Sequence, residues 1–156
     1  MTRSSPTARI RGFTLLELVI VLVILGTLAA FAVPRFAPAD NTLAAQADRL
    51  ARDLRHAQAL AMNQGRTLIL DVQSATAYRV TAAGSTITDP ATQQPYTVAL
   101  DNGVTLTGSA TGFDSLGRPV GAGSLLAAAR VFTLSGSSRS AVVTLSPVTG
   151  FVTVSP

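Results

Sequence analysis

Glu17 is the residue whose position says most about chemistry. Its carboxylate lies near the start of FTLLELVIVLVILGTLAAFAV, residues 13–33, where no other side chain is charged. A carboxylate inside the hydrocarbon of a membrane costs roughly 2.5–3.5 kcal/mol on insertion scales. An acid at this position therefore requires a positively charged partner.

The rest of the sequence offers little for catalysis. It has no cysteine, which excludes disulfide scaffolds, thiolate metal sites and cysteine nucleophiles, and its one histidine is His56. Of its eight acids, the seven other than Glu17 lie beyond residue 33 and are scattered singly. No hydrolase, zinc-protease, phosphate-loop or dinucleotide motif occurs. We therefore predict a protein that is not an enzyme and that binds no metal or cofactor.

The apolar run is long enough to be a membrane anchor. Its 21 residues would form a helix of about 31 Å, and Arg3, Arg9 and Arg11 precede it. By the positive-inside rule, the N-terminus stays in the cytoplasm and the C-terminal part crosses the membrane. These three arginines also account for most of the net charge of +4, because the remainder has nine arginines against eight acids. The basic composition therefore says little about nucleic acids.

Two other interpretations of this segment remain open. Ala30-Phe31-Ala32 offers a signal-peptidase site after a basic start, although a secretory apolar region normally has only about 7–15 residues. A simple membrane anchor is the second interpretation. Neither of them explains Glu17.

The sequence Arg11-Gly12-Phe13-Thr14-Leu15-Leu16-Glu17, followed directly by the apolar run, resembles the class III signal of type IV pilins and type II secretion pseudopilins. The resemblance implies that a prepilin peptidase cuts between Gly12 and Phe13 and methylates the new amine of Phe13. It also implies that Glu17 pairs with the terminal amine of a neighbouring subunit during assembly. Processing would thus create the partner that this acid requires.

A second, amphipathic helix is predicted after the apolar run. Leu43, Ala47, Leu50, Leu54, Ala57 and Ala61 alternate at spacings of four and three, which places them on one face. Gly65 is expected to cap the helix, and His56 to lie on a solvated or flanking face. Packing on the chain's own sheet is favoured over a coiled coil. At Pro34 and Pro38 we expect a kinked continuous helix, with a break and a cap at Asp40 or Asn41 as the alternative.

Strand patterns follow Gly65. They cover residues 67–72, 77–81, 96–100, 104–107, 125–134, 141–145 and 151–154, with loops between them. One long helix followed by short strands with close turns predicts an α+β, pilin-like fold with an antiparallel sheet.

The segments after the apolar run resemble the GspH/FimT-type minor pseudopilins. The resemblance rests on an Arg- and Ala-rich helix, Arg66 in the turn to the first strand, the segment Phe113–Pro119 with its Gly-Arg step, and a closing hairpin through Thr149-Gly150. Residues 114–117 are expected to form a turn, with Phe113 and Leu116 buried and Gly117 at positive φ; a contact with a partner is the alternative. Related major pseudopilins bind calcium through acids near the C-terminus. No acid follows Asp114 here, so we expect no such site.

These patterns predict a leader at 1–12, a transmembrane helix at 13–39, an amphipathic helix at 40–64 and a periplasmic β domain at 65–156. As the resemblance implies, the chain would be a single-pass protein of the bacterial inner membrane. Its partners would be prepilin peptidase, other pilin or pseudopilin subunits, assembly platform proteins and membrane lipid.

The filament would be a type II secretion pseudopilus or a type IV pilus. The alternative is a FimT-like DNA-binding minor pilin for natural transformation, in which arginines of a Gly-Arg-x-Arg segment bind DNA. This chain has Gly150-Phe151-Val152-Thr153 in that place. Only Arg118, Arg130 and Arg139 follow Asp114 as charged side chains, so any attraction to a phosphate backbone rests on these three.

Overall fold

The computed structural model describes residues 14–32 and 38–155. The chain divides into two compact units, residues 1–36 and 37–156, and each is described by itself. This division separates the apolar helix from a domain that contains the hydrophobic core.

Helix α1, Leu15–Ala32, forms the described part of the first unit. All its side chains from Leu15 to Ala29 are exposed, and Leu15 is 81% accessible. Within the described residues, none of the helices combines the length and the apolar character needed to span a membrane. Phe13 and residues 33–37 lie outside the described part, and with them the predicted cleavage site and the predicted continuity through Pro34.

Helix α2, Pro38–Gln64, begins two residues before the predicted amphipathic segment. Pro38 is its first residue, a position where the fixed φ of proline suits a helix and its missing N–H costs nothing. Asp40 therefore lies in the first turn, and the alternative in which Asp40 or Asn41 caps the helix is wrong. The helix ends as predicted, since Gly65 has a φ of 62° and the N–H of Arg66 donates to the carbonyl of Ala61 over 3.2 Å.

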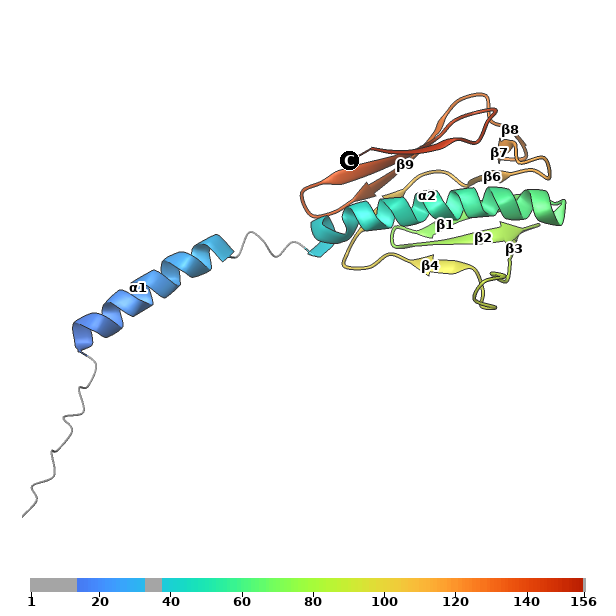
Figure 1. Ribbon diagram of the computed structural model, residues 1–156. Helices are drawn as coiled ribbons and strands as arrows, with labels where there is room; N and C mark the ends of the chain where they lie inside the picture. The colour runs from blue at the N-terminus through green and yellow to red at the C-terminus, as the bar shows by residue number, and fades with distance from the viewer. Residues whose placement is uncertain (1–13, 33–37, 156) are drawn as a thin grey trace, which may run out of the picture. The chain divides into compact units, whose positions relative to one another are not determined.

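The predicted apolar face of α2 is confirmed. Each of its six side chains is at most 4% exposed: Leu43, Ala47, Leu50, Leu54, Ala57 and Ala61. Figure 1 shows α2 lying across strands from both sheets of the domain. The helix thus packs on the chain's own sheets, and together they bury the large rings of Tyr78, Phe113 and Phe132.

Two antiparallel sheets make up the rest of the domain. The first has seven strands in the order β3-β2-β1-β6-β7-β8, and β4 also pairs with β2. Their bounds are β1 Leu68–Ser74, β2 Ala77–Ala82, β3 Ser85–Thr86, β4 Thr97–Ala99, β6 Thr111–Phe113, β7 Pro119–Gly121 and β8 Ser124–Leu125.

The second sheet has four strands in the order β11-β10-β9-β5. Their bounds are β5 Thr105–Thr107, β9 Arg130–Ser135, β10 Ser140–Leu145 and β11 Val152–Ser155. Along β10, buried Ala141, Val143 and Leu145 alternate with more accessible residues, so one face of this sheet covers α2.

Four short strands depart from the sequence prediction. Strand β3 lies in a segment expected to be a loop, β6 and β7 flank the predicted turn, and the predicted strand 125–134 is divided between β8 and β9. Each missed strand has two or three residues, too few for an alternating pattern to emerge. Their pairing with β1 and with each other defines them instead.

Candidate functional site

The first candidate site is the N-terminal turn of α1. The Oγ1 of Thr14 accepts the N–H of Glu17 over 3.2 Å, and the carbonyl of Thr14 accepts the N–H of Leu18. Thr14 is therefore the N-cap of α1, and Glu17 is its third helical residue. The spacing Thr-x-x-Glu is a sequence signal for such a cap, and the sequence analysis missed it.

The carboxylate of Glu17 lies in the first turn of an apolar helix. Within residues 14–32 and 38–155 it forms no hydrogen bond or ion pair. Its place near the positive end of the helix dipole is favourable for an anion. This turn therefore presents one negative charge, free to interact with a cation, at the head of an otherwise uncharged helix.

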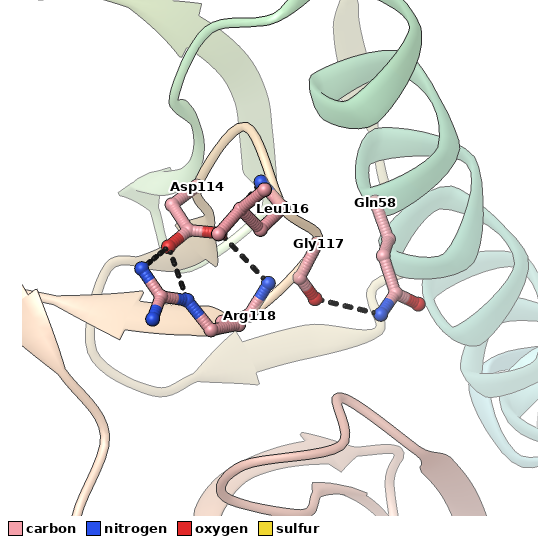
Figure 2. Close-up of polar contacts among 5 residues, drawn as sticks. All are labelled: Gln58, Asp114, Leu116, Gly117 and Arg118. Atoms are coloured by element: carbon pink, nitrogen blue, oxygen red, sulfur yellow. Dashed lines mark hydrogen bonds and ion pairs between the residues drawn. The ribbon is translucent and has the colours of Figure 1, made fainter.

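The second candidate site is the turn between β6 and β7, which Asp114 organises (Figure 2). Its Oδ1 accepts the N–H groups of Leu116 and Arg118 at 2.9 Å each. Its Oδ2 accepts the Nε of Arg118 at 2.8 Å and lies 2.7 Å from that residue's Nη2. Partial burial raises the pKa of Asp114, but the hydrogen bonds from Arg118 and Leu116 outweigh it and hold that pKa below 3.8.

Gln58 of α2 ties this turn to the loop between β10 and β11. Its Nε2 donates to the carbonyl of Gly117 at 2.8 Å and to that of Thr149 at 3.3 Å (Figure 2). Gly117 has a φ of 77°, as predicted, and a Cβ there would lie 2.5 Å from the Sδ of Met62. A Cβ on Gly150, also at positive φ, would lie 2.6 Å from the Nε2 of Gln58. Both loops therefore approach the end of α2 closely because they carry glycine there.

Four exposed apolar side chains surround this junction. Met62, Leu116, Val148 and Phe151 are 52%, 69%, 78% and 64% accessible, and we call them the tip patch. Phe113 is fully buried, as predicted, but the prediction that Leu116 is buried is wrong. The hydrogen bonds of Asp114 fix the turn so that the side chain of Leu116 points to solvent. Only the meeting of two loops on α2 brings these residues together.

A third, polar cluster lies between α2 and the loop at residues 88–95. Tyr78 donates its hydroxyl to Asp53 Oδ2 over 2.6 Å, and the hydroxyl of Tyr96 lies 3.4 Å from Nδ1 of His56. Burial, followed by the negative charge of Asp53, raises the pKa of both tyrosines. These phenols thus stay protonated and serve as hydrogen-bond donors. His56 is half-buried on the flank of α2, as predicted.

In the part of the chain that the structure describes, no three histidine or acidic side chains come together as metal ligands. The three late arginines are separated in the domain. Arg118 is paired with Asp114 near the end of α2, Arg130 is half-buried at the start of β9, and Arg139 lies beside Asp40 at the other end of α2. They do not form one continuous basic surface.

Comparisons with known proteins agree with both parts of the chain. Residues 7–33 match the family described as the prokaryotic N-terminal methylation motif, and residues 46–150 match the family described as type II transport protein GspH. The chain is 48% identical over 59 residues to the type IV narrow pilus major component PilA5 of Thermus thermophilus. That match covers 37% of this chain and 51% of the relative, so the chain spans about half the length of the curated relative.

Among solved structures, the type IV minor pilin FimU of Pseudomonas aeruginosa resembles this domain. The TM-score is 0.54 at 17% identity, and the match covers 73% of this chain and 93% of the other. At this identity the likeness concerns the fold, and it confirms the predicted pilin-like α+β architecture.

Proposed function

Because the chain belongs to the family described as type II transport protein GspH, we propose that it is a structural minor pseudopilin or minor pilin subunit. In this proposal it is not an enzyme and works by assembling with other subunits into a type II secretion pseudopilus or a type IV pilus. The observation that carries the proposal is helix α1, an exposed apolar helix whose single charge is the unpaired Glu17 in its first turn. Such a surface is stable only against lipid or other apolar helices.

Processing at Gly12 and Phe13 is the first step of the proposed function. Prepilin peptidase would cut after Gly12, which lacks a side chain and so lets the backbone enter a narrow cleft. The new amine of Phe13, once methylated, would carry the positive charge that Glu17 of a neighbouring subunit requires. The match of residues 7–33 to the N-terminal methylation motif supports this step.

The same proposal covers location and partners. The precursor would be held in the bacterial inner membrane by the segment 13–39, with its N-terminus in the cytoplasm and residues 40–156 in the periplasm. Assembly platform proteins would then draw it into a filament with other pilin-type subunits. The name of the PilA5 relative, a component of a pilus, supports assembly of this kind.

DNA binding is not favoured. Arg118 and Arg139 lie at opposite ends of α2, and the charge of Arg118 is compensated by Asp114. A protein that tracks a phosphate backbone needs several cations along one surface.

Mass spectrometry of the mature chain tests the processing step. We expect the chain to begin with N-methylated Phe13; an intact Met1 or a start at Val33 would reject it. Glu17→Ala should be processed normally but incorporated into filaments about tenfold less or worse, since loss of one partner of a buried charge pair costs about 2 kcal/mol or more. Thr27→Ala, a neutral change in the same helix, is the control and should be incorporated like the parent. Equal incorporation of Glu17→Ala would contradict the charge pairing.

A further inference from the structure

The tip patch is a preformed surface. Both of its loops are bonded to one amide of Gln58, and Met62 lies against Gly117, so the four apolar side chains are neighbours. Val148 holds a φ of 70°, which a β-branched residue rarely adopts, and is the most exposed of the four. Solvation of the monomer does not explain an apolar cluster held in this way, whereas contact with another surface does.

A groove lies near the opposite end of the domain. It has a volume of about 490 Å³, and its apolar walls come from Leu43 and Ala44 of α2, Ala141 of β10 and Val154 of β11. Small side chains at Ala44 and Ala141 leave the space open. Asp40 and Asp48 border it, together with Arg139. A volume of this size admits inserted side chains.

The two surfaces are complementary in shape and charge. The tip patch projects and the groove is hollow. Arg66 and Arg118 against Asp114 give the tip a net charge of +1, whereas Asp40 and Asp48 against Arg139 give the groove −1. Ala44 and Met62 are 18 residues apart on one helix, about 27 Å along its axis, so one chain cannot join its own two surfaces.

We propose that the tip patch of one copy docks into the groove between α2, β10 and β11 of a second copy, with Phe151 inserted beside Ala44. A contact between two different surfaces of identical chains does not close on itself and instead propagates head to tail. The inference rests on the proposed function, because such a contact adds a lateral connection between the domains of subunits in a filament. It makes a separate claim, since neither Glu17 nor cleavage takes part in it.

Cysteine cross-linking of the purified full chain in detergent micelles tests the contact. The native sequence has no cysteine, so every disulfide reports an introduced pair. A chain carrying both Ala44→Cys and Phe151→Cys is oxidised at several protein concentrations and separated by non-reducing electrophoresis. A disulfide requires Cα atoms about 4.4–6.8 Å apart, so only close docking gives a product.

We expect a ladder of dimers, trimers and larger species from the double variant, and monomers from each single variant. Ala44→Cys with Gln73→Cys, an exposed residue outside the tip patch, is the matched control and should give at least about tenfold less ladder. A double variant that stays monomeric, or dimers from Phe151→Cys alone, would overturn the proposal; the second result would mean that two tips meet each other.

A charge substitution provides an independent readout. Adding Phe151→Asp to a chain with cysteines at 44 and 148 should abolish its ladder, because an acid would enter an acidic groove. Val131→Asp, an equally simple change at an exposed apolar residue of β9, should leave the ladder intact. Equal ladders from both variants would reject the groove as the docking site. Because micelles replace the filament, this outcome is independent of the Glu17 and N-terminal tests, and either claim can fail alone.

Discussion

Two carboxylates, Asp40 and Asp114, show how single residues fix the loops at either end of this domain. Asp40 accepts the hydroxyl and the N–H of Ser138 at 2.5 and 3.1 Å and the N–H of Arg139 at 3.2 Å, so it holds the hairpin between β9 and β10 against α2. These bonds from Ser138 lower the pKa of Asp40 below 3.8. Asp114 does the same within its own turn. Both residues are thus hydrogen-bond acceptors that must be ionised for full effect.

Acid should therefore weaken the folded domain. A carboxyl with a lowered pKa in the folded state stabilises the fold at pH values above its unfolded pKa, near 3.8, and this stability is lost as the pH falls through the folded pKa. Asp114→Asn retains an acceptor for the turn but removes the charge. We expect its thermal midpoint to lie about 2–5 °C below the parent at pH 7 and to approach the parent near pH 3.

Circular dichroism of the full chain in detergent, recorded from pH 7 to pH 3, measures this effect. The matched variant Arg118→Gln removes the other partner, and the double variant should lose little more than either single one, since both act on one pair. A constant difference between Asp114→Asn and the parent at all pH values would contradict the argument.

At the scale of elements, α2 organises the domain. Its buried face lies across both sheets, and its flank supplies Gln46, Arg55 and Gln58 as hydrogen-bond donors to segments far along the chain. The bond of Arg55 to the carbonyl of Val152 is informative, because it occupies a backbone acceptor on the outer edge of β11. A charged side chain at such an edge opposes unspecific strand pairing.

Leu54→Ala should test the packing of α2. The side chain is fully buried, and its truncation leaves a cavity, so we expect a loss of about 2–5 kcal/mol in the free energy of unfolding. Arg52→Ala, an exposed change one turn away or less, should alter it by no more than about 0.5 kcal/mol. Urea titration followed by near-ultraviolet circular dichroism distinguishes the two, and equal effects would show that α2 does not carry the core.

At the scale of the whole molecule, two units with different requirements share one chain. The core residues all belong to residues 39–152, whereas the described side chains of α1 are exposed. The domain therefore has its own hydrophobic core, and α1 needs surroundings that the chain does not itself supply. This division fits a subunit whose helix is held by lipid or neighbouring helices while its domain stays folded.

A fragment of residues 38–156 should accordingly fold alone. We expect it to be monomeric at low concentration and to unfold in one cooperative step, with a midpoint within about 3 °C of the full chain in detergent. Scanning calorimetry of both proteins makes the comparison. A fragment that is unfolded, or whose midpoint is lower by 10 °C or more, would mean that residues before Pro38 stabilise the domain.

Local patterns determined much of this molecule. The spacing of leucine and alanine predicted the buried face of α2, Gly65 its end, and Gly117 a positive φ, because each depends on neighbours within about one or two helical turns. The motif around Gly12, Phe13 and Glu17 likewise pointed to the pilin family, which the comparisons then showed. Longer strands with alternating residues, such as β10, were predicted for the same reason.

The tertiary structure alone decided features that join distant parts of the chain. Asp40 binds residues 98 and 99 positions away, and Gln58 joins two loops that lie 59 and 91 positions along the chain. Strands of two or three residues exist only because a neighbouring strand pairs with them, and Leu116 is exposed because Asp114 holds its turn. No local pattern encodes such contacts, since their energy comes from groups that only folding brings within reach.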